Sequence, residues 1–375
     1  MKRILYICNS DLAVRHGGAL CQKAYLNALN KIIPGKVDVV LPEEFCVKEY
    51  EEAIKVPKRS ILKVITSLCI HRFKSFMKDF LKENADKYSH CIINHGTYAG
   101  DMMDMIHKYG IKIMVIHHNY EKEYHMDNRD ALTLKGHYAG FVVRNERNAY
   151  RKADVNCFLT KSDLNTFRKV YGYQGNCHVT GVFETDDKPL PEVGDFPKEN
   201  LLGITGSMNT VQTILGVMDL KDNYFDILKN KMPDWKIIIA GRNPSDKIQQ
   251  FAQMNNDVIQ LIPNPENMDD VVGRCKVFIC PTNVGGGLKL RVMDGLRLGL
   301  PVFTHEISAR GYDDFFDLPF FNVYNDRKSF EKGIDNIMKI QFNAEMRKHI
   351  QNTYLDSFGF NAGMKRFKVA WDVFI

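Results

Sequence analysis

Residues 277–311 read VFICPTNVGGGLKLRVMDGLRLGLPVFTHEISARG, and this stretch decides which type of fold the chain can adopt. A short apolar run, Val277–Cys280, is followed by the glycine run Gly285–Gly287. An amphipathic pattern then continues to Gly299 and Pro301, which are residues that end helices. The order of strand, glycine turn, helix and strand is typical of a doubly wound α/β domain.

Short β-rich runs and longer helical patterns alternate along the rest of the chain as well. In the first half we expect strands near Arg3–Cys8, Val37–Leu41, His90–Asn94, Ile111–Ile116, Asp154–Leu159 and Cys177–Thr180. In the second half we expect strands near Leu201–Thr205, Trp235–Ala240, Val258–Leu261, Val277–Cys280 and Pro301–Thr304. Helical patterns of the first half lie near Ala19–Lys31, Ser60–Lys82, Ala99–Lys108, Tyr138–Lys152 and Ser162–Val170.

A polar, proline-containing stretch at residues 183–200 interrupts this alternation and is typical of a linker. We therefore predict two Rossmann-like doubly wound domains, residues 1–182 and 201–355, that face a central cleft. The aromatic face of residues 356–375 predicts a helix that packs back toward the first domain. In such sheets a ligand binds beyond the carboxyl ends of the strands.

The overall composition excludes several classes of protein. A net charge of +6 over 375 residues is too small to indicate nucleic-acid binding by itself. The nine cysteines are scattered, and several lie in apolar runs, which is typical of a reducing compartment. The apolar run at the N-terminus is too short for a signal peptide, and no stretch reaches the length of a membrane-spanning helix. We therefore expect a cytoplasmic protein.

The glycine run has the chemistry of a phosphate-binding turn. Glycines let the backbone approach a ligand closely, and a helix start attracts anions. We expect the helix to start directly after the glycines, with Lys289 and Arg291 within about one turn of its start. Asp294 is expected two turns inside the helix and could accept hydrogen bonds from ribose hydroxyls. The alternative is a tight turn followed by a solvated charged face. Neither a P-loop nor a G-x-G-x-x-G motif is present.

Several motifs, in the same order along the chain, resemble those of family 4 glycosyltransferases of the GT-B fold (glycosyl transferases group 1). The stretch 277–311 resembles the donor-site motif of this family, LLGITGSMNTVQ at 201–212 its glycine loop, and WKIIIAGRNP at 235–244 its strand ending in AG. In the first half, MVIHHNYEKEY at 114–124 and RNERNAYRKADVNCFLTKSDLNTF at 144–167 are similar to two further motifs.

The resemblance implies that residues 201–355 bind the nucleotide-sugar donor and that residues 1–182 bind the acceptor. The implied donor-binding residues are Gly206, Ser207, Arg242, Gly286, Gly287, Leu288, Lys289, Arg291 and Asp294. The sequence departs from the family pattern at three of its acidic positions. Gly286 stands where the family has its first glutamate, Asp294 replaces the second, and Arg310 replaces the glutamate of a later loop.

In the first half, His117 and His118 end a predicted strand, and neighbouring residues of a strand point to opposite faces, so both cannot serve one site. The resemblance selects His118 as the catalytic residue. A purely structural role is the alternative for His118. Gly17 and Gly18 open a helix after the first strand, again with free backbone donors. The alternative is a plain turn between the strand and the helix. The implied acceptor-binding residues are Gly17, Gly18, Asn119 and Glu121.

The resemblance implies a retaining, metal-independent transferase with a UDP- or GDP-sugar as donor and a glycan or lipid-linked acceptor. No zinc-type histidine or cysteine spacing and no D-x-D motif is present, so we expect no metal and no other cofactor. Surface polysaccharide or glycolipid synthesis is the expected setting. The alternative is a catalytically weak or inactive nucleotide-binding partner subunit, because Gly286 replaces a glutamate. A sugar-nucleotide epimerase is a third hypothesis.

Residues 55–82 combine eight basic residues with apolar residues at helical spacing. This basic amphipathic pattern predicts a weak, peripheral contact with an anionic membrane, on the inner face of the cell membrane. The alternative is that the apolar stripe packs on the domain and the lysines are solvated.

Overall fold

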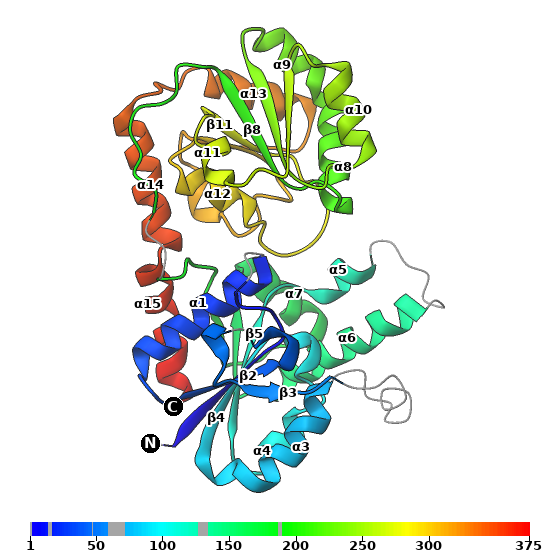
Figure 1. Ribbon diagram of the computed structural model, residues 1–375, viewed down its shortest axis with the longest axis vertical. Coiled ribbons are helices and arrows are strands. Elements are labelled where there is room, and N and C mark those ends of the chain that lie inside the picture. Colours follow the sequence, from blue (N-terminus) through cyan, green and yellow to red (C-terminus); the bar gives the residue numbers. More distant parts are fainter. Residues whose placement is uncertain (1, 14–16, 47, 59–71, 127–133, 187–189) are drawn as a thin grey trace. The chain divides into compact units, whose positions relative to one another are not determined.

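The chain folds into two compact units in the computed structural model (Figure 1). The N-terminal unit comprises Met1–Asp187 and Phe358–Ile375, and the C-terminal unit comprises Lys188–Ser357. The division falls inside the stretch 183–200 that the sequence predicts as a linker. The structure describes residues 2–13, 17–46, 48–58, 72–126, 134–186 and 190–375.

In the described part of the N-terminal unit, seven parallel strands form a sheet in the order β3-β2-β1-β4-β5-β6-β7. The strands are β1 (Arg3–Cys8), β2 (Val37–Pro42), β3 (Ile54–Val56), β4 (Tyr88–Asn94), β5 (Lys112–His117), β6 (Val155–Phe158) and β7 (Cys177–Val179). The α-helices are α1 (Gly17–Ile32), α3 (Arg72–Asn84), α4 (Met103–His107), α5 (Glu121–Met126), α6 (Leu134–Lys152), α7 (Lys161–Tyr171) and α15 (Phe360–Phe374). Short 3-10 turns are η1 (Glu43–Phe45), η2 (Lys48–Tyr50), η3 (Ala85–Lys87) and η4 (Gly96–Tyr98).

In the described part of the C-terminal unit, six parallel strands form a sheet in the order β10-β9-β8-β11-β12-β13. The strands are β8 (Leu201–Ser207), β9 (Lys236–Arg242), β10 (Ile259–Pro263), β11 (Val277–Cys280), β12 (Val302–His305) and β13 (Phe321–Tyr324). The helices are α8 (Val211–Asp219), α9 (Phe225–Lys231), α10 (Asp246–Met254), α11 (Met268–Val272), α12 (Arg291–Arg297), α13 (Arg327–Ile337) and α14 (Ala344–Phe358), with the π-helical turn η5 (Leu220–Tyr224) and the 3-10 turn η6 (Asp313–Phe315).

The predicted fold class, doubly wound α/β in both halves of the chain, is confirmed by these two sheets. Strands β1 and β11 have the bounds that the sequence predicts. The prediction missed β3 and β13, which are short strands at the edges of the two sheets. Edge strands pair on one side only, so they need less of the continuous apolar sequence that identifies a central strand.

The C-terminal helix α15 packs on the N-terminal unit. The ring centroid of its Phe367 lies 5.2 Å from that of Tyr25 in α1, in an edge-to-face arrangement, and both residues are fully buried. Arg366 donates from Nε to the carbonyl of Thr180 at 3.0 Å, next to the end of β7. Phe183, at the start of the predicted linker, is also fully buried and contacts Tyr25 at 4.8 Å. The first residues of that stretch are therefore part of the core of this unit.

The basic stretch 55–82 is not one continuous helix. Lys55 belongs to β3, residues 59–71 lie outside the described part, and α3 comprises Arg72–Asn84. Phe73, Met77 and Leu81 of α3 are buried in the core, so its apolar face packs on the domain. Among the described residues, no helix combines the length and the apolar character that crossing a membrane needs. The contact with an anionic membrane stays a prediction.

Each sheet has a point where the strand order reverses, and in α/β sheets ligands bind beyond the carboxyl ends of the strands at such a point. In the N-terminal sheet this point lies between β1 and β4, and in the C-terminal sheet between β8 and β11. The residues that follow β4, β8 and β11 are therefore the first to consider for function.

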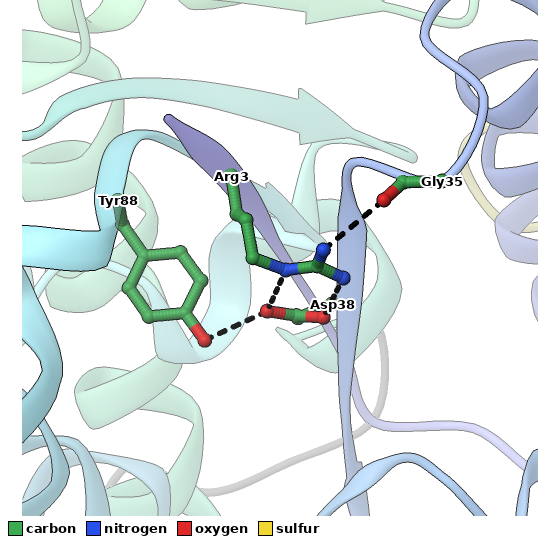
Figure 2. Close-up of polar contacts among 4 residues, drawn as sticks. All are labelled: Arg3, Gly35, Asp38 and Tyr88. Atoms are coloured by element: carbon green, nitrogen blue, oxygen red, sulfur yellow. Dashed lines mark hydrogen bonds and ion pairs between the residues drawn. The ribbon is translucent and has the colours of Figure 1, made fainter. Parts of the chain in front are cut away.

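An ion pair fixes three strands of the N-terminal sheet at the opposite edge, where the strands begin. Figure 2 shows Asp38 of β2 between Arg3 of β1 and Tyr88 of β4. Arg3 Nε donates to Asp38 Oδ2 at 2.7 Å, the Tyr88 hydroxyl donates to the same oxygen at 2.8 Å, and a second Arg3 nitrogen pairs with Oδ1. Arg3 also donates to the carbonyl of Gly35 at 3.1 Å. Partial burial raises the pKa of Asp38, but the hydrogen bonds from Arg3 and Tyr88 outweigh it, and the net pKa is lowered.

We expect Asp38→Asn to lower the free energy of unfolding by about 1–3 kcal/mol, because charge-assisted hydrogen bonds to Arg3 and Tyr88 are lost. A lowered pKa stabilises the fold above the unfolded value of about 3.9, and this contribution disappears as the pH falls through the lower folded value. Urea unfolding at pH 7 and below pH 3 should therefore show a difference from wild type that shrinks in acid. Asp86→Asn, at an exposed carboxylate of η3, is the matched control. An equal effect of the two substitutions would contradict the assignment.

Candidate functional site

The loop between β11 and α12 carries the glycine run and differs in one respect from the prediction. Helix α12 begins at Arg291, so Lys289 precedes it and Asp294 lies in its first turn. The prediction that the helix starts directly after the glycines, with Asp294 two turns inside it, is wrong. Gly285 and Gly287 have φ angles of 89° and 70°, a left-handed conformation that bends the chain before a helix can begin.

Lys289 is part of the scaffold of this loop. Its Nζ donates to the carbonyls of Gly285 at 3.0 Å and Gly286 at 2.7 Å. The buried Tyr312 donates its hydroxyl to the Lys289 carbonyl at 2.9 Å. The ammonium therefore turns the two glycine carbonyls toward Lys289. This leaves the amides of the same loop free to point away from Lys289.

The amides of Gly285–Leu288 make no hydrogen bond to another protein group within the part of the chain that the structure describes. These residues are half-buried. Backbone amides need a partner from the protein, from water or from a ligand. A run of successive unpaired amides at a glycine turn is therefore suited to an anion.

Arg291, the first residue of α12, lies against Gly206 at the end of β8. A Cβ atom added to Gly206 would lie 2.2 Å from Cζ of Arg291, and the φ angle of Gly206 is 152°. The half-buried guanidinium has no hydrogen bond or ion pair with any residue that the structure describes. Strand pairing places Ser207 opposite Arg242, an exposed residue at the end of β9. The carboxyl edge of this sheet thus joins two arginines with the unpaired amides.

We expect Gly206→Ala to raise the dissociation constant for a nucleoside diphosphate about tenfold or more, because the methyl group displaces the Arg291 guanidinium and alanine strains this backbone conformation. Isothermal titration with UDP and GDP measures the change. The matched control is Gly175→Ala, at a glycine with open space around its Cα and an ordinary φ angle. Unchanged nucleotide affinity in Gly206→Ala would contradict the placement of the ligand beside Arg291.

Asp294 and Arg310 also lie near this edge. Asp294 is half-buried in the first turn of α12, close enough to the buried Tyr312 to contribute to the raised pKa of that phenol, whose main cause is burial. Arg310 is half-buried and follows β12 by a few residues. The ribose-binding role of Asp294 stays a prediction.

In the N-terminal unit, His117 and His118 face different neighbours, as the sequence predicts. His117 Nε2 contacts Asn156 Oδ1 of β6 at 2.9 Å, and its ring stacks on Phe158 at 5.0 Å. Burial lowers the pKa of His117 to about 4. His118 lies just after β5 and contacts Asn94 Oδ1 of β4 with Nε2 at 2.6 Å. Burial, with smaller contributions from His95 and His117, lowers the pKa of His118 well below its ordinary value, so the ring is neutral at pH 7.

His95 is a second histidine at this edge that the sequence prediction missed. It follows β4 directly, has a φ angle of 123°, and its ring centroid lies 4.6 Å from that of His118. A non-glycine residue in this conformation costs roughly 1–3 kcal/mol and is often found at functional sites. The signal in the sequence is its position directly after a predicted central strand.

Glu121 is buried and its carboxylate lies 3.5 Å from Nε2 of His95. Its backbone amide donates to the fully buried Glu146 at 2.8 Å, and Tyr171 donates its hydroxyl to the other Glu146 oxygen at 2.8 Å. Burial raises the pKa of Glu146 to about 8, although the hydrogen bond from the Glu121 amide opposes this. The carboxylate of Glu121 therefore pairs with the His95 ring. An acceptor-binding role of Glu121 stays a prediction.

The remaining predicted residues of this unit lie at element ends. Gly17 and Gly18 are the first residues of α1, after the undescribed residues 14–16, and Asn119 is half-buried between β5 and α5. Among the described residues, no group of three or more histidine, cysteine, aspartate or glutamate side chains could hold a metal ion.

Comparisons with known proteins agree with the predicted resemblance. Residues 199–317 match the sequence profile of the family described as Glycosyl transferases group 1. No curated protein matches the chain. The structure of HepE from Anabaena in complex with UDP is 10% identical, with 99% of both chains covered and a TM-score of 0.68. The lipopolysaccharide outer core galactosyltransferase WaaB is 11% identical, with 99% of both chains covered and a TM-score of 0.68.

TarM from S. aureus is 13% identical over 80% of this chain, with a TM-score of 0.60, and the present chain spans 58% of its length. Likeness at these identities shows the fold, which is the GT-B fold of these transferases. The family resemblance itself is confirmed over residues 199–317, which include the loop after β11 and the end of β8.

Proposed function

We propose that this chain, which has the GT-B fold and matches glycosyl transferases group 1 over residues 199–317, is a retaining glycosyltransferase. It moves a hexosyl group from a UDP- or GDP-sugar to a glycan or lipid-linked acceptor, in surface polysaccharide or glycolipid synthesis. The setting is the cytoplasm, with peripheral contact to the inner face of the membrane through residues 55–82. The structures of HepE with UDP and with UDP-glucose make UDP-sugars the first donors to test.

One observation carries the donor assignment. The Arg291 guanidinium, without a partner among the described residues, lies against Gly206 in the same unit as the unpaired amides of Gly285–Leu288. A half-buried cation without a carboxylate partner is costly, and a diphosphate removes that cost. Asp294 is the proposed partner of the ribose.

The chemistry follows from where charge develops. When the bond between the sugar and the diphosphate breaks, negative charge builds on the β-phosphate. Arg291, Arg242 and the loop amides are fixed donors, and fixed donors stabilise a developing charge because they need no reorganisation. They also supply the positive charge that a metal ion supplies in other transferases, and we therefore propose that no metal is needed. The acceptor oxygen forms its bond to the anomeric carbon on the same face from which the diphosphate leaves, and the proton of the acceptor hydroxyl passes to the leaving phosphate.

His118 is proposed to orient the sugar or a phosphate oxygen. A neutral ring suits this role, because it offers one donor and one acceptor. Gly17, Gly18 and Asn119 are proposed to contact the acceptor. Positioning of this kind lowers the barrier by holding the reacting groups in a productive geometry.

The test is nucleotide release from a panel of UDP- and GDP-sugars, with and without a crude lipid-linked acceptor and with EDTA present. Acceptor-dependent release and a glycosylated product are expected. Binding of UDP or GDP without transfer of any sugar would favour the partner-subunit alternative, for which Gly286 in place of a glutamate is the observation. Conversion of the donor without acceptor would favour an epimerase. Absence of any nucleotide binding would contradict all three.

A further inference from the structure

A buried chain of hydrogen bonds connects His118 to helix α1. The hydroxyl of Tyr6, in β1, contacts the carbonyl oxygen of Gln22 in α1 at 2.6 Å. Nδ2 of Asn94, in β4, contacts the same hydroxyl at 2.6 Å. Oδ1 of Asn94 contacts Nε2 of His118 at 2.6 Å. Tyr6 and Asn94 are fully buried, so no water competes for these bonds.

The direction of every bond in this chain is determined by its first member. The backbone carbonyl of Gln22 can only accept, so Tyr6 uses its single proton there. The oxygen of Tyr6 can then only accept, which requires the amino group of Asn94 to face it. The carbonyl oxygen of Asn94 consequently faces His118, and Nε2 of His118 must carry the proton.

The surroundings of His118 keep this ring neutral. Burial is the main reason, and the nearby His95, whose ring centroid lies 4.6 Å away, and His117 contribute less. Glu121 pairs with His95 at 3.5 Å, and Glu146 accepts a hydrogen bond from the Glu121 amide. No carboxylate contacts His118 itself among the described residues. A neutral ring with its proton on Nε2 has a lone pair on Nδ1. Nδ1 of His118 has no hydrogen-bond partner in the described part of the chain. It is also not among the described side-chain atoms that are both fully buried and unpaired, so a ligand can reach it.

We propose that Asn94 is the positioning residue of His118: held by Tyr6, it fixes the Nε2-protonated tautomer and presents Nδ1 as an acceptor for a hydroxyl of the bound sugar. The use of Nδ1 by a sugar rests on the proposed function, whereas the tautomer does not. The same chain connects the histidine to α1, whose first residues Gly17 and Gly18 are predicted to bind ligand.

A purely structural role for Asn94 is the competing interpretation, because a buried amide needs partners in any case. The two interpretations differ in one observable. A structural amide affects stability, whereas a positioning amide sets which nitrogen of His118 is protonated and at which pH the ring becomes charged.

The test is long-range proton–nitrogen NMR on the full chain with ¹⁵N-labelled histidine, and the His118 signals are assigned by their loss in His118→Gln. We expect the wild-type ring to be neutral and protonated on Nε2. In Asn94→Asp, a carboxylate faces the ring and favours its charged form, so the pKa of His118 should rise by about 1–3 units. The acid limb of the pH profile of kcat should shift to higher pH by the same amount, because Nδ1 of the charged ring carries a proton and can no longer accept a hydrogen bond.

Tyr6→Phe is the second variant, in case Asn94→Asp does not fold. It removes the group that orients the amide, and an Nδ1-protonated population of His118 should become visible. The matched control is Tyr98→Phe, which removes a buried hydroxyl that donates to the backbone carbonyl of the same Asn94 at 2.8 Å. This control should lower stability by a similar amount and leave the tautomer unchanged.

Protonation of wild-type His118 on Nδ1, or an unchanged tautomer and pKa in Asn94→Asp and Tyr6→Phe, would overturn the proposal. An Nε2-protonated ring that responds to both substitutions in a chain without transferase activity would leave the assignment of Asn94 standing and would count against the proposed function alone.

Discussion

Arg291→Ala is expected to lower kcat/KM for the nucleotide sugar by about 100- to 1,000-fold, the loss found when one fixed donor to a developing charge is removed. The guanidinium lies against Gly206 and has no carboxylate partner among the described residues, so its removal breaks no internal ion pair there. The dissociation constant for UDP should rise about tenfold or more, since hydrogen bonds to charged groups contribute roughly 1.5–3 kcal/mol. Steady-state kinetics and isothermal titration measure the two effects.

Arg274→Ala is the matched control for this prediction. Arg274 is an exposed arginine of the same unit that precedes β11, at the other end of the strand. Arg291→Lys keeps the charge but lacks the planar fork that binds phosphate through two hydrogen bonds, so its loss should be intermediate. Equal kinetics of Arg291→Ala and Arg274→Ala would show that the diphosphate binds elsewhere.

His118→Ala is expected to lower kcat by about 100-fold or more, within the range for a positioned side chain that acts in the transition state. Affinity for UDP should change by less than about twofold, because the nucleotide is assigned to residues of the C-terminal unit. The separation of kcat from nucleotide affinity distinguishes this role from a structural one. Steady-state assays give kcat, and isothermal titration with UDP on the same preparation gives the dissociation constant.

The control for His118 is His107→Ala, which removes a partly exposed histidine whose Nε2 lies 2.9 Å from Asp154. His107 ends α4, before β5 begins, and therefore lies at the opposite edge of the sheet from His118. The His107→Ala variant should keep the wild-type kcat. A loss of UDP affinity in His118→Ala that equals the loss of kcat would contradict the assignment of the nucleotide to the other unit.

Much of the fold could be predicted from the sequence because central strands of a parallel sheet are continuous apolar runs with sharp ends. Val277–Cys280 stops at Pro281, and Arg3–Cys8 stops before Asn9, so both strands have the predicted bounds. Ile54–Val56 has three residues within a basic stretch, and its membership of the sheet depends on pairing with β2. Local sequence does not contain that information.

The candidate site was predictable in its residue types and only partly in its geometry. The glycine run, Arg291 and His118 were identified from spacing and resemblance. Lys289 was expected to face a phosphate, whereas the structure gives its ammonium two carbonyl partners in the loop itself. Spacing shows that Lys289 can reach a ligand, but a glycine loop that bends back offers it nearer acceptors.

The sequence by itself determined the class of fold, the order of the strands' apolar runs and the presence of a glycine turn beside arginines, because these depend on patterns between neighbouring residues. Only the tertiary structure brings together His118, Asn94, Tyr6 and the Gln22 carbonyl, the contacts from which we infer the protonation of His118. Its three controlling hydrogen bonds join residues that lie 16, 88 and 24 positions apart. A hydrogen bond depends on contact in space, and such contact between distant residues exists only after β1, β4, β5 and α1 have packed together.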